Sequence, residues 1–102
     1  LEKALSLSPN DPFILDSMGW LYYREKNYSV ALEFLNRAVS LRQDPEIIEH
    51  QIVVLKAMGR DDEAIRIWRA GLQQFPDNKE LRARGKALGL DRALPPQPSQ
   101  SL

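Results

Sequence analysis

The feature that most constrains the fold of this chain is an internal repeat with a period of 33 to 34 residues. Residues 35–38 (LNRA) are echoed 33 residues later by residues 68–71 (WRAG), and the pair Asp11–Pro12 is echoed at the same spacing by Asp44–Pro45. A repeat of this length is typical of helix-turn-helix units that stack into an elongated array. Such arrays present surfaces that hold other molecules, so the repeat favours binding over catalysis.

Two helix starts are marked by an aspartate that directly precedes a proline, at Asp11 and at Asp44. An aspartate in this position accepts hydrogen bonds from the free N–H groups of the first helical turn. Proline suits the first helical position because the N–H that it lacks would have no partner there. With the other boundary signals, we predict helices over residues 1–8, 12–25, 28–41, 45–58, 61–75 and 78–89.

The later boundaries depend on a glycine and on further acidic residues. Gly59 is expected to be a left-handed helix stop, Asp61 to cap the next helix, and Asp77 with Glu80 to form a capping box. The last helix contains Gly85, and a glycine in a helix interior costs about 1 kcal/mol relative to alanine. We therefore expect residues 78–90 to form a short, solvent-facing capping helix. Residues 91–102, rich in proline and serine, are expected to form a disordered tail.

Large, small and aromatic residues stand at fixed offsets in the first unit, at Leu15, Met18, Gly19 and Tyr22 and then at Ala31, Leu35 and Ala38. This pattern resembles the tetratricopeptide repeat (TPR) family. The resemblance implies an all-α fold, an antiparallel helix-turn-helix TPR solenoid that ends in the capping helix. Residues 1–11 would be the second helix of a preceding repeat, and residues 12–44 and 45–77 would be two TPR units.

The second unit departs from this pattern on its first helix. Gln51 and Ile52 stand where the first unit has Met18 and Gly19, and Gly71 replaces an alanine on the partner helix. We expect Ile52 to be buried in space that Gly71 leaves free. Gln51 is expected to be hydrogen-bonded or partly hydrated.

The first helix of each unit carries a second stripe, which in the TPR family lines the groove that binds extended peptides or partner helices. Here Trp20 and Tyr23 supply aromatic area for affinity, and charged neighbours supply register. The alternative is that both aromatic residues simply pack on a neighbouring unit. The candidate partner-binding residues are Phe13, Asp16, Trp20, Tyr23, Arg24, Glu46, Glu49, Val53 and Lys56.

Composition argues against several other functions. The 14 Lys and Arg residues equal the 14 Asp and Glu residues in number, so no net charge directs the chain to nucleic acid. Cysteine is absent and His50 is the sole histidine, so we expect an ordinary surface or inter-helix histidine and no metal site. No nucleophile motif, phosphate-binding loop or cofactor motif is visible. We therefore predict no catalytic residue, no cofactor and no enzymatic activity.

A narrower resemblance is carried by residues 16–23 (DSMGWLYY) and 44–50 (DPEIIEH). These segments are similar to the C-terminal repeats of bacterial outer-membrane-lipoprotein-type TPR adaptors, some of which bring substrates to a carboxyl-terminal processing protease. The resemblance implies a non-enzymatic scaffold in the periplasm, associated with the outer membrane, whose partner is a protein or peptide such as that protease or its substrates. The alternatives are a purely structural end-cap of a longer solenoid and a cytoplasmic location.

The first residue, Leu1, lies inside a predicted helix. We therefore expect the chain to be the C-terminal part of a longer repeat protein. Contact with a membrane would then occur only through a lipid anchor on the missing N-terminal part.

Overall fold

The computed structural model describes residues 10–92, and the regular structure within them is helical. The helices, in chain order, are α2 (Pro12–Arg24), α3 (Tyr28–Leu41), α4 (Pro45–Ala57), α5 (Asp61–Gln74) and α6 (Lys79–Ala87). The ends of these helices agree with the predicted boundaries to within two residues. The helix predicted over residues 1–8 and most of the predicted tail lie outside the described residues. None of the described helices combines the length and the apolar character needed to cross a membrane.

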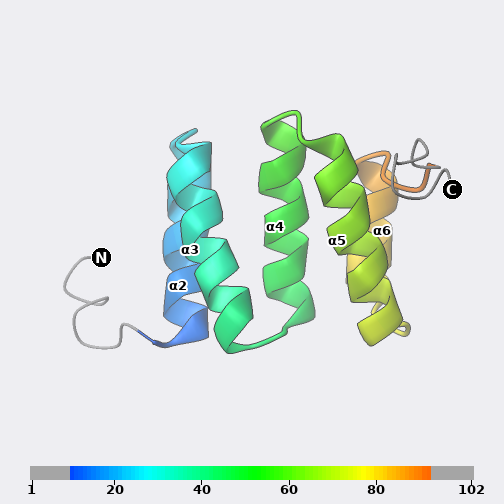
Figure 1. The fold of residues 1–102 in the computed structure, drawn as a ribbon, viewed down its shortest axis with the longest axis horizontal. Coiled ribbons are helices and arrows are strands. Elements are labelled where there is room, and N and C mark those ends of the chain that lie inside the picture. The colour runs from blue at the N-terminus through cyan, green and yellow to red at the C-terminus, as the bar shows by residue number, and fades with distance from the viewer. Residues whose placement is uncertain (1–9, 93–102) are drawn as a thin grey trace, which may run out of the picture.

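Consecutive helices alternate in direction and form two hairpins followed by a single helix (Figure 1). In this view α3 and α5 lie in front, and α2 and α6 lie behind them. Helix α4 is central, because it packs against α2, α3, α5 and α6. The first helices of the successive units, α2, α4 and α6, therefore share one side of the array. We call this side the α2–α4–α6 face.

The predicted helix starts and the predicted stop are confirmed. Asp11 caps α2, because its Oδ1 accepts a hydrogen bond from the backbone N–H of Phe13 at 2.9 Å. Asp44 caps α4 in the same way, and its Oδ1 accepts from the N–H of Glu46 at 2.9 Å. Gly59 follows α4 with φ +76°, a left-handed conformation that glycine adopts without a steric penalty.

Asp61 has a different role from the one predicted. It is the first residue of α5 and makes no capping hydrogen bond. Instead its Oδ2 accepts from Lys56 Nζ at 2.9 Å and from Arg92 Nη2 at 3.0 Å. The hydrogen bond from Lys56, with a smaller contribution from Arg92, lowers the pKa of Asp61 below its usual value. Asp61 therefore ties the end of α4 and the residues after α6 to the start of α5.

The capping box predicted at Asp77 and Glu80 is wrong, because Asn78 caps α6. The Asn78 Oδ1 accepts a hydrogen bond from the backbone N–H of Leu81 at 2.8 Å. Asn78 directly precedes the first residue of α6, so its side chain reaches the N–H of the third helical residue. Asp77 lies one residue too early for this contact.

Gly19 and Ile52 occupy equivalent positions but produce different helix pairs. A Cβ atom on Gly19 would lie 2.8 Å from Leu35 Cγ and 3.1 Å from the carbonyl oxygen of Ala31, so glycine allows α2 and α3 to approach closely. Ile52 is fully buried, as predicted. Helices α4 and α5 pack less extensively than α2 and α3, as expected where an isoleucine replaces the glycine.

The expectation that Gly71 leaves space for Ile52 is wrong. A Cβ atom on Gly71 would lie 3.1 Å from both Ile48 Cγ2 and Leu81 Cδ2, so this glycine faces α4 one turn away from Ile52 and also faces α6. Gln51 is buried and its Nε2 donates to Asn36 Oδ1 at 2.9 Å. The prediction of a hydrogen-bonded Gln51 is therefore confirmed.

Helix α6 closes the core by packing on Trp68. The indole of Trp68 is only 4% exposed, and its Nε1–H donates to the carbonyl oxygen of Leu81 at 2.8 Å. A Cβ atom on Gly85 would lie 1.9 Å from Trp68 Cε2, so the indole or α6 would have to shift to make room for it. Gly85 therefore does more than weaken the helix, because its missing side chain lets α6 lie flat against the indole.

Candidate functional site

An aromatic stack joins the first helices of the two units. The Trp20 ring stacks on Tyr23 of α2, with centroids 4.7 Å apart and planes inclined at 25°. The same ring stacks on His50 of α4, with centroids 4.2 Å apart and planes inclined at 27°. All three side chains are partly exposed, so they form a continuous aromatic surface on the α2–α4–α6 face.

Asp16 of α2 pairs with His50, which belongs to this stack. The Asp16 Oδ1 and His50 Nδ1 atoms are 2.6 Å apart, and they join residues that are 34 positions apart in the sequence. Asp16 is only 8% exposed, and a carboxylate that is nearly buried needs a polar partner within the protein. His50 supplies that partner. His50 is thus the inter-helix histidine that the sequence allowed. Asp16, although a candidate for partner contact, offers little surface to a partner.

A second polar contact of the same kind joins α4 to α6. Arg84 Nε donates to Glu49 Oε1 at 3.0 Å, and these residues are 35 positions apart. Asp16 and Glu49 are equivalent residues in the two units, at a separation of 33. Helices α2 and α4 therefore each extend a carboxylate toward an imidazole or guanidinium group on the next first helix.

Asp16, Glu46 and His50 are the described residues whose donor atoms converge closely enough to hold a metal ion. Their candidate ligand atoms all lie within 4.8 Å of one another, and a nitrogen with two carboxylate donors suits a divalent transition metal. Sequence reasoning missed this grouping because Asp16 comes from a different helix. The Asp16–His50 hydrogen bond already accounts for the closest contact in the group.

A pocket of about 540 Å³ lies between the N-terminal halves of α4 and α6. Four carboxylate side chains and one guanidinium group contribute to its lining, which consists of Asp44, Pro45, Glu46, Glu49, His50, Asn78, Glu80 and Arg84. His50 therefore belongs both to this pocket and to the aromatic stack. We call this hollow the α4–α6 pocket. Sequence reasoning missed the contributions of Glu80 and Arg84, because it treated the last helix as a solvent-facing cap.

The remaining candidate residues are spread over the face. Phe13 is 49% exposed, and the guanidinium of Arg42 lies 5.5 Å from its ring centroid. Arg24 is exposed at the end of α2, whereas Val53 is buried in the core. Lys56 is engaged by Asp61. The structure therefore brings Trp20, Tyr23, Glu46 and Glu49 close to the pocket and the aromatic stack, and it places the other candidates apart or inside.

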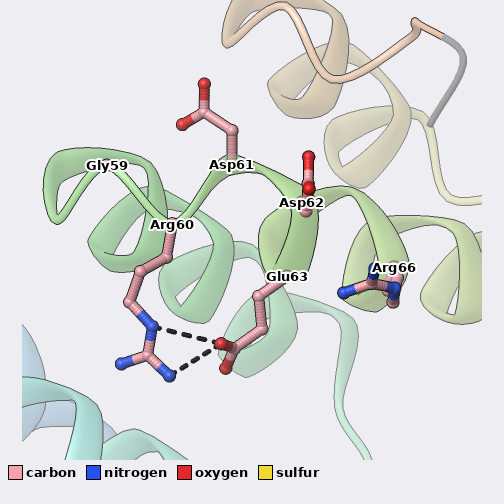
Figure 2. Close-up of a pocket in the computed structure, with 6 residues that line it drawn as sticks. All are labelled: Gly59, Arg60, Asp61, Asp62, Glu63 and Arg66. Atoms are coloured by element: carbon pink, nitrogen blue, oxygen red, sulfur yellow. Dashed lines mark hydrogen bonds and ion pairs between the residues drawn. The ribbon is translucent and has the colours of Figure 1, made fainter. Parts of the chain in front are cut away.

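Another hollow, of about 360 Å³, lies at the turn between α4 and α5 (Figure 2). It is lined by Gly59, Arg60, Asp61, Asp62, Glu63 and Arg66, and Figure 2 shows two hydrogen bonds from Arg60 to Glu63. These residues are contiguous or nearly so. The fold therefore brings together no distant groups here, and the α4–α6 pocket is the stronger candidate site.

Comparison with known proteins gives one similarity over part of the chain, although no family model matches it. A segment of 48 residues, 47% of the chain, is 44% identical to a TPR repeat-containing protein of Pseudomonas aeruginosa. The matched segment spans 8% of the length of that protein. Over this segment the chain is therefore similar to a TPR repeat-containing protein, and its all-α helix-turn-helix arrangement is consistent with a TPR-like helical repeat.

Proposed function

We propose that this chain is a non-enzymatic protein-binding segment of a TPR adaptor and that it holds a protein or peptide on the α2–α4–α6 face. The observation that carries the proposal is the aromatic stack of Trp20, Tyr23 and His50 at the edge of the α4–α6 pocket. Partly exposed aromatic rings beside a hollow are typical anchors of binding surfaces, because they offer a large contact area at a small entropic cost.

The charged groups around the stack would fix the register of the partner. Glu46 is exposed, and Glu49 and Arg84 form a partly exposed ion pair at the pocket wall. Charges at the rim of an interface contribute mainly to specificity and to the association rate. The face thus combines a source of affinity with a source of selectivity.

Site-specific photo-crosslinking in the full-length protein tests this proposal. Glu46 on α4 and Arg24 at the end of α2 are exposed positions on first helices, and Glu33 and Arg37 are exposed positions on α3. We expect the same partner protein to be captured from the first two positions and not from the α3 positions. Capture from α3 alone would contradict the proposed binding face.

A finer part of the proposal is that the partner is a carboxyl-terminal processing protease of the periplasm or one of its substrates. The support is the resemblance of residues 16–23 and 44–50 to bacterial lipoprotein adaptors. A lipid anchor on an N-terminal segment would then hold the protein at the outer membrane. Purified full-length protein should accelerate substrate cleavage by such a protease, and unchanged cleavage would leave a scaffold with another partner.

The second candidate function is a structural end-cap. This function is favoured by α6, because Leu81 and Gly85 of that helix cover the indole of Trp68, whose apolar surface would otherwise be exposed. A pure end-cap would give no crosslinked partner from either set of positions. Truncation before Asn78 would then expose the core and unfold the second unit.

A further inference from the structure

We propose that Asp16 is a positioning residue of the α2–α4–α6 face. It fixes the proton of the neutral His50 ring on Nδ1, so that Nε2 is presented as a hydrogen-bond acceptor to an N–H or O–H group of the partner. The inference rests on the proposed function, because it names the chemistry that the partner brings to this face. It is carried by the contact between the two side chains, by the burial of Asp16 and by the accessibility of Nε2.

The Asp16 carboxylate determines which nitrogen of His50 carries the proton. Its Oδ1 lies 2.6 Å from His50 Nδ1. An ionised carboxylate only accepts hydrogen bonds, and a neutral imidazole has one donor and one acceptor nitrogen. Nδ1 must therefore be the donor, and Nε2 keeps its lone pair. The hydrogen bond of one ring nitrogen commonly sets the tautomer of a histidine in this way.

Burial makes the opposite tautomer costly. The Asp16 side chain is 11% exposed and the His50 side chain is 16% exposed, so little water can replace the hydrogen bond between them. A proton on Nε2 would leave the lone pairs of Nδ1 and Oδ1 facing each other across the same 2.6 Å. A nearly buried carboxylate without its donor would then bear its full desolvation cost.

Trp20 fixes the orientation of the ring that Asp16 holds at one edge. The indole stacks on the imidazole, with centroids 4.2 Å apart and planes inclined at 27°. A rotation of the imidazole would lose both the stack and the hydrogen bond. The direction of Nε2 is therefore set before any partner arrives, which is the condition for a preorganised binding group.

Nε2 is the accessible polar atom of this arrangement. His50 lines the α4–α6 pocket. Over residues 10–92, His50 makes its hydrogen bond through Nδ1 alone, and no buried side-chain nitrogen lacks a partner, so Nε2 is in contact with solvent. A partner that covers the ring must supply a donor to Nε2 or leave a desolvated acceptor unpaired. Asp16 thus influences the choice of partner although it offers little surface of its own.

NMR spectroscopy reads the tautomer directly, because His50 is the sole histidine of the chain. The full chain is labelled with ¹⁵N and studied at about pH 9 with EDTA, well above the ordinary histidine pKa of about 6.5. In a long-range ¹H–¹⁵N correlation spectrum, the unprotonated ring nitrogen resonates far downfield of the protonated one. We expect Nδ1 to be protonated and Nε2 unprotonated. The reverse assignment in the wild type would overturn the proposal, whatever the variants do.

Two variants separate the hydrogen bond from a general effect of charge. Asp16→Ala removes the acceptor, so the ring should revert to the Nε2–H tautomer that imidazole favours in water. Glu46→Ala is the matched control, because Glu46 is the other carboxylate whose donor atom lies within 4.8 Å of the group. It should leave the tautomer unchanged. An unchanged tautomer in Asp16→Ala, or the same change in both variants, would reject the role of Asp16.

Binding is measured in the full-length protein with the partner that a crosslinker at Arg24 captures. Asp16→Leu combined with His50→Phe removes the acceptor, keeps a ring against Trp20 and leaves no buried carboxylate unpaired. The affinity should fall about fivefold, the scale of one hydrogen bond. An unchanged affinity would reject the donor on the partner. If the wild type captures no partner, the proposed function fails and the donor with it, whereas the NMR spectrum decides the role of Asp16 independently.

Discussion

The indole of Trp68 lies directly on the backbone of Gly85, with no room for a β carbon between them. Helix propensity alone favours Gly85→Ala by about 1 kcal/mol. Because the added methyl group would overlap the indole, we expect the opposite result, a net loss of at least about 1–2 kcal/mol in the free energy of unfolding. Urea denaturation measures this change, and a more stable variant would contradict the packing.

The matched control is Ala83→Gly on the same helix, at an exposed position. It removes an exposed methyl group, so it should cost only about 1 kcal/mol through helix propensity. The two substitutions are the reverse of each other, yet both should destabilise the protein.

The buried isoleucine of the second unit gives another prediction. Ile52→Gly removes a fully buried side chain and adds the conformational cost of glycine, so it should destabilise the protein by about 3–5 kcal/mol. Ile52→Val should cost only about 1 kcal/mol. Both values are measured as changes in the free energy of unfolding. A neutral Ile52→Gly would mean that α4 and α5 move together to fill the space, as closely as α2 and α3 approach at Gly19.

Lys26 adopts a left-handed conformation with φ 66°, in the turn between α2 and α3. A residue with a β carbon is strained in this region by about 1 kcal/mol, and glycine is not. Lys26→Gly should therefore raise the midpoint of thermal unfolding. Glu25→Gly is the control, because Glu25 has φ −85° and should gain nothing from the change. An equal effect of both substitutions would argue against strain at Lys26.

A double-mutant cycle on Asp16 and His50 measures the contact between the two units. Each single change to alanine removes one side of a partly buried hydrogen bond and leaves the other side without its partner, at a cost of about 1–3 kcal/mol. The double change should cost less than the sum of the single changes, with a coupling energy of about 1 kcal/mol or more. Additive effects would show that the 2.6 Å contact contributes no stability.

Asp61 gives a prediction about pH. Its pKa is lowered in the folded state by Lys56 and Arg92, so the ionised form is favoured by folding. The resulting stability is present above the pKa of the unfolded chain and is lost as the pH falls through the lower folded value. The difference in unfolding free energy between the wild type and Asp61→Asn should thus shrink between pH 7 and strongly acidic conditions. A constant difference would assign the effect to some other contact of Asp61.

Local chemistry explains which parts of this fold can be predicted from the sequence. Asp11 and Asp44 act on N–H groups two and three residues away, and the conformation of Gly59 depends on its own backbone, so these features were predictable. The cap at Asn78 was missed because Asp77 offers the same chemistry one residue earlier.

The candidate site was predictable in part. Helical periodicity places Trp20, Tyr23 and Glu46 on a shared face, but it does not say which atoms of two different helices meet. The Asp16–His50 pair spans 34 residues, and the contact of Trp68 with Gly85 depends on the position of α6. Arg84 was missed for the same reason, although it lies 34 residues after His50, within the repeat period.

The contacts between successive first helices have a mechanical consequence. The pair of Asp16 with His50 joins α2 to α4, and the pair of Glu49 with Arg84 joins α4 to α6. These two polar pairs help to set the position of each first helix relative to the next. Partly exposed polar pairs open more easily than the apolar core, which itself continues from α3 to α4 across the units, so these pairs are the first contacts between the first helices to yield. Opening of the Glu49–Arg84 pair would therefore loosen α6 from α4 at this point while the hairpin of α4 and α5 stays folded.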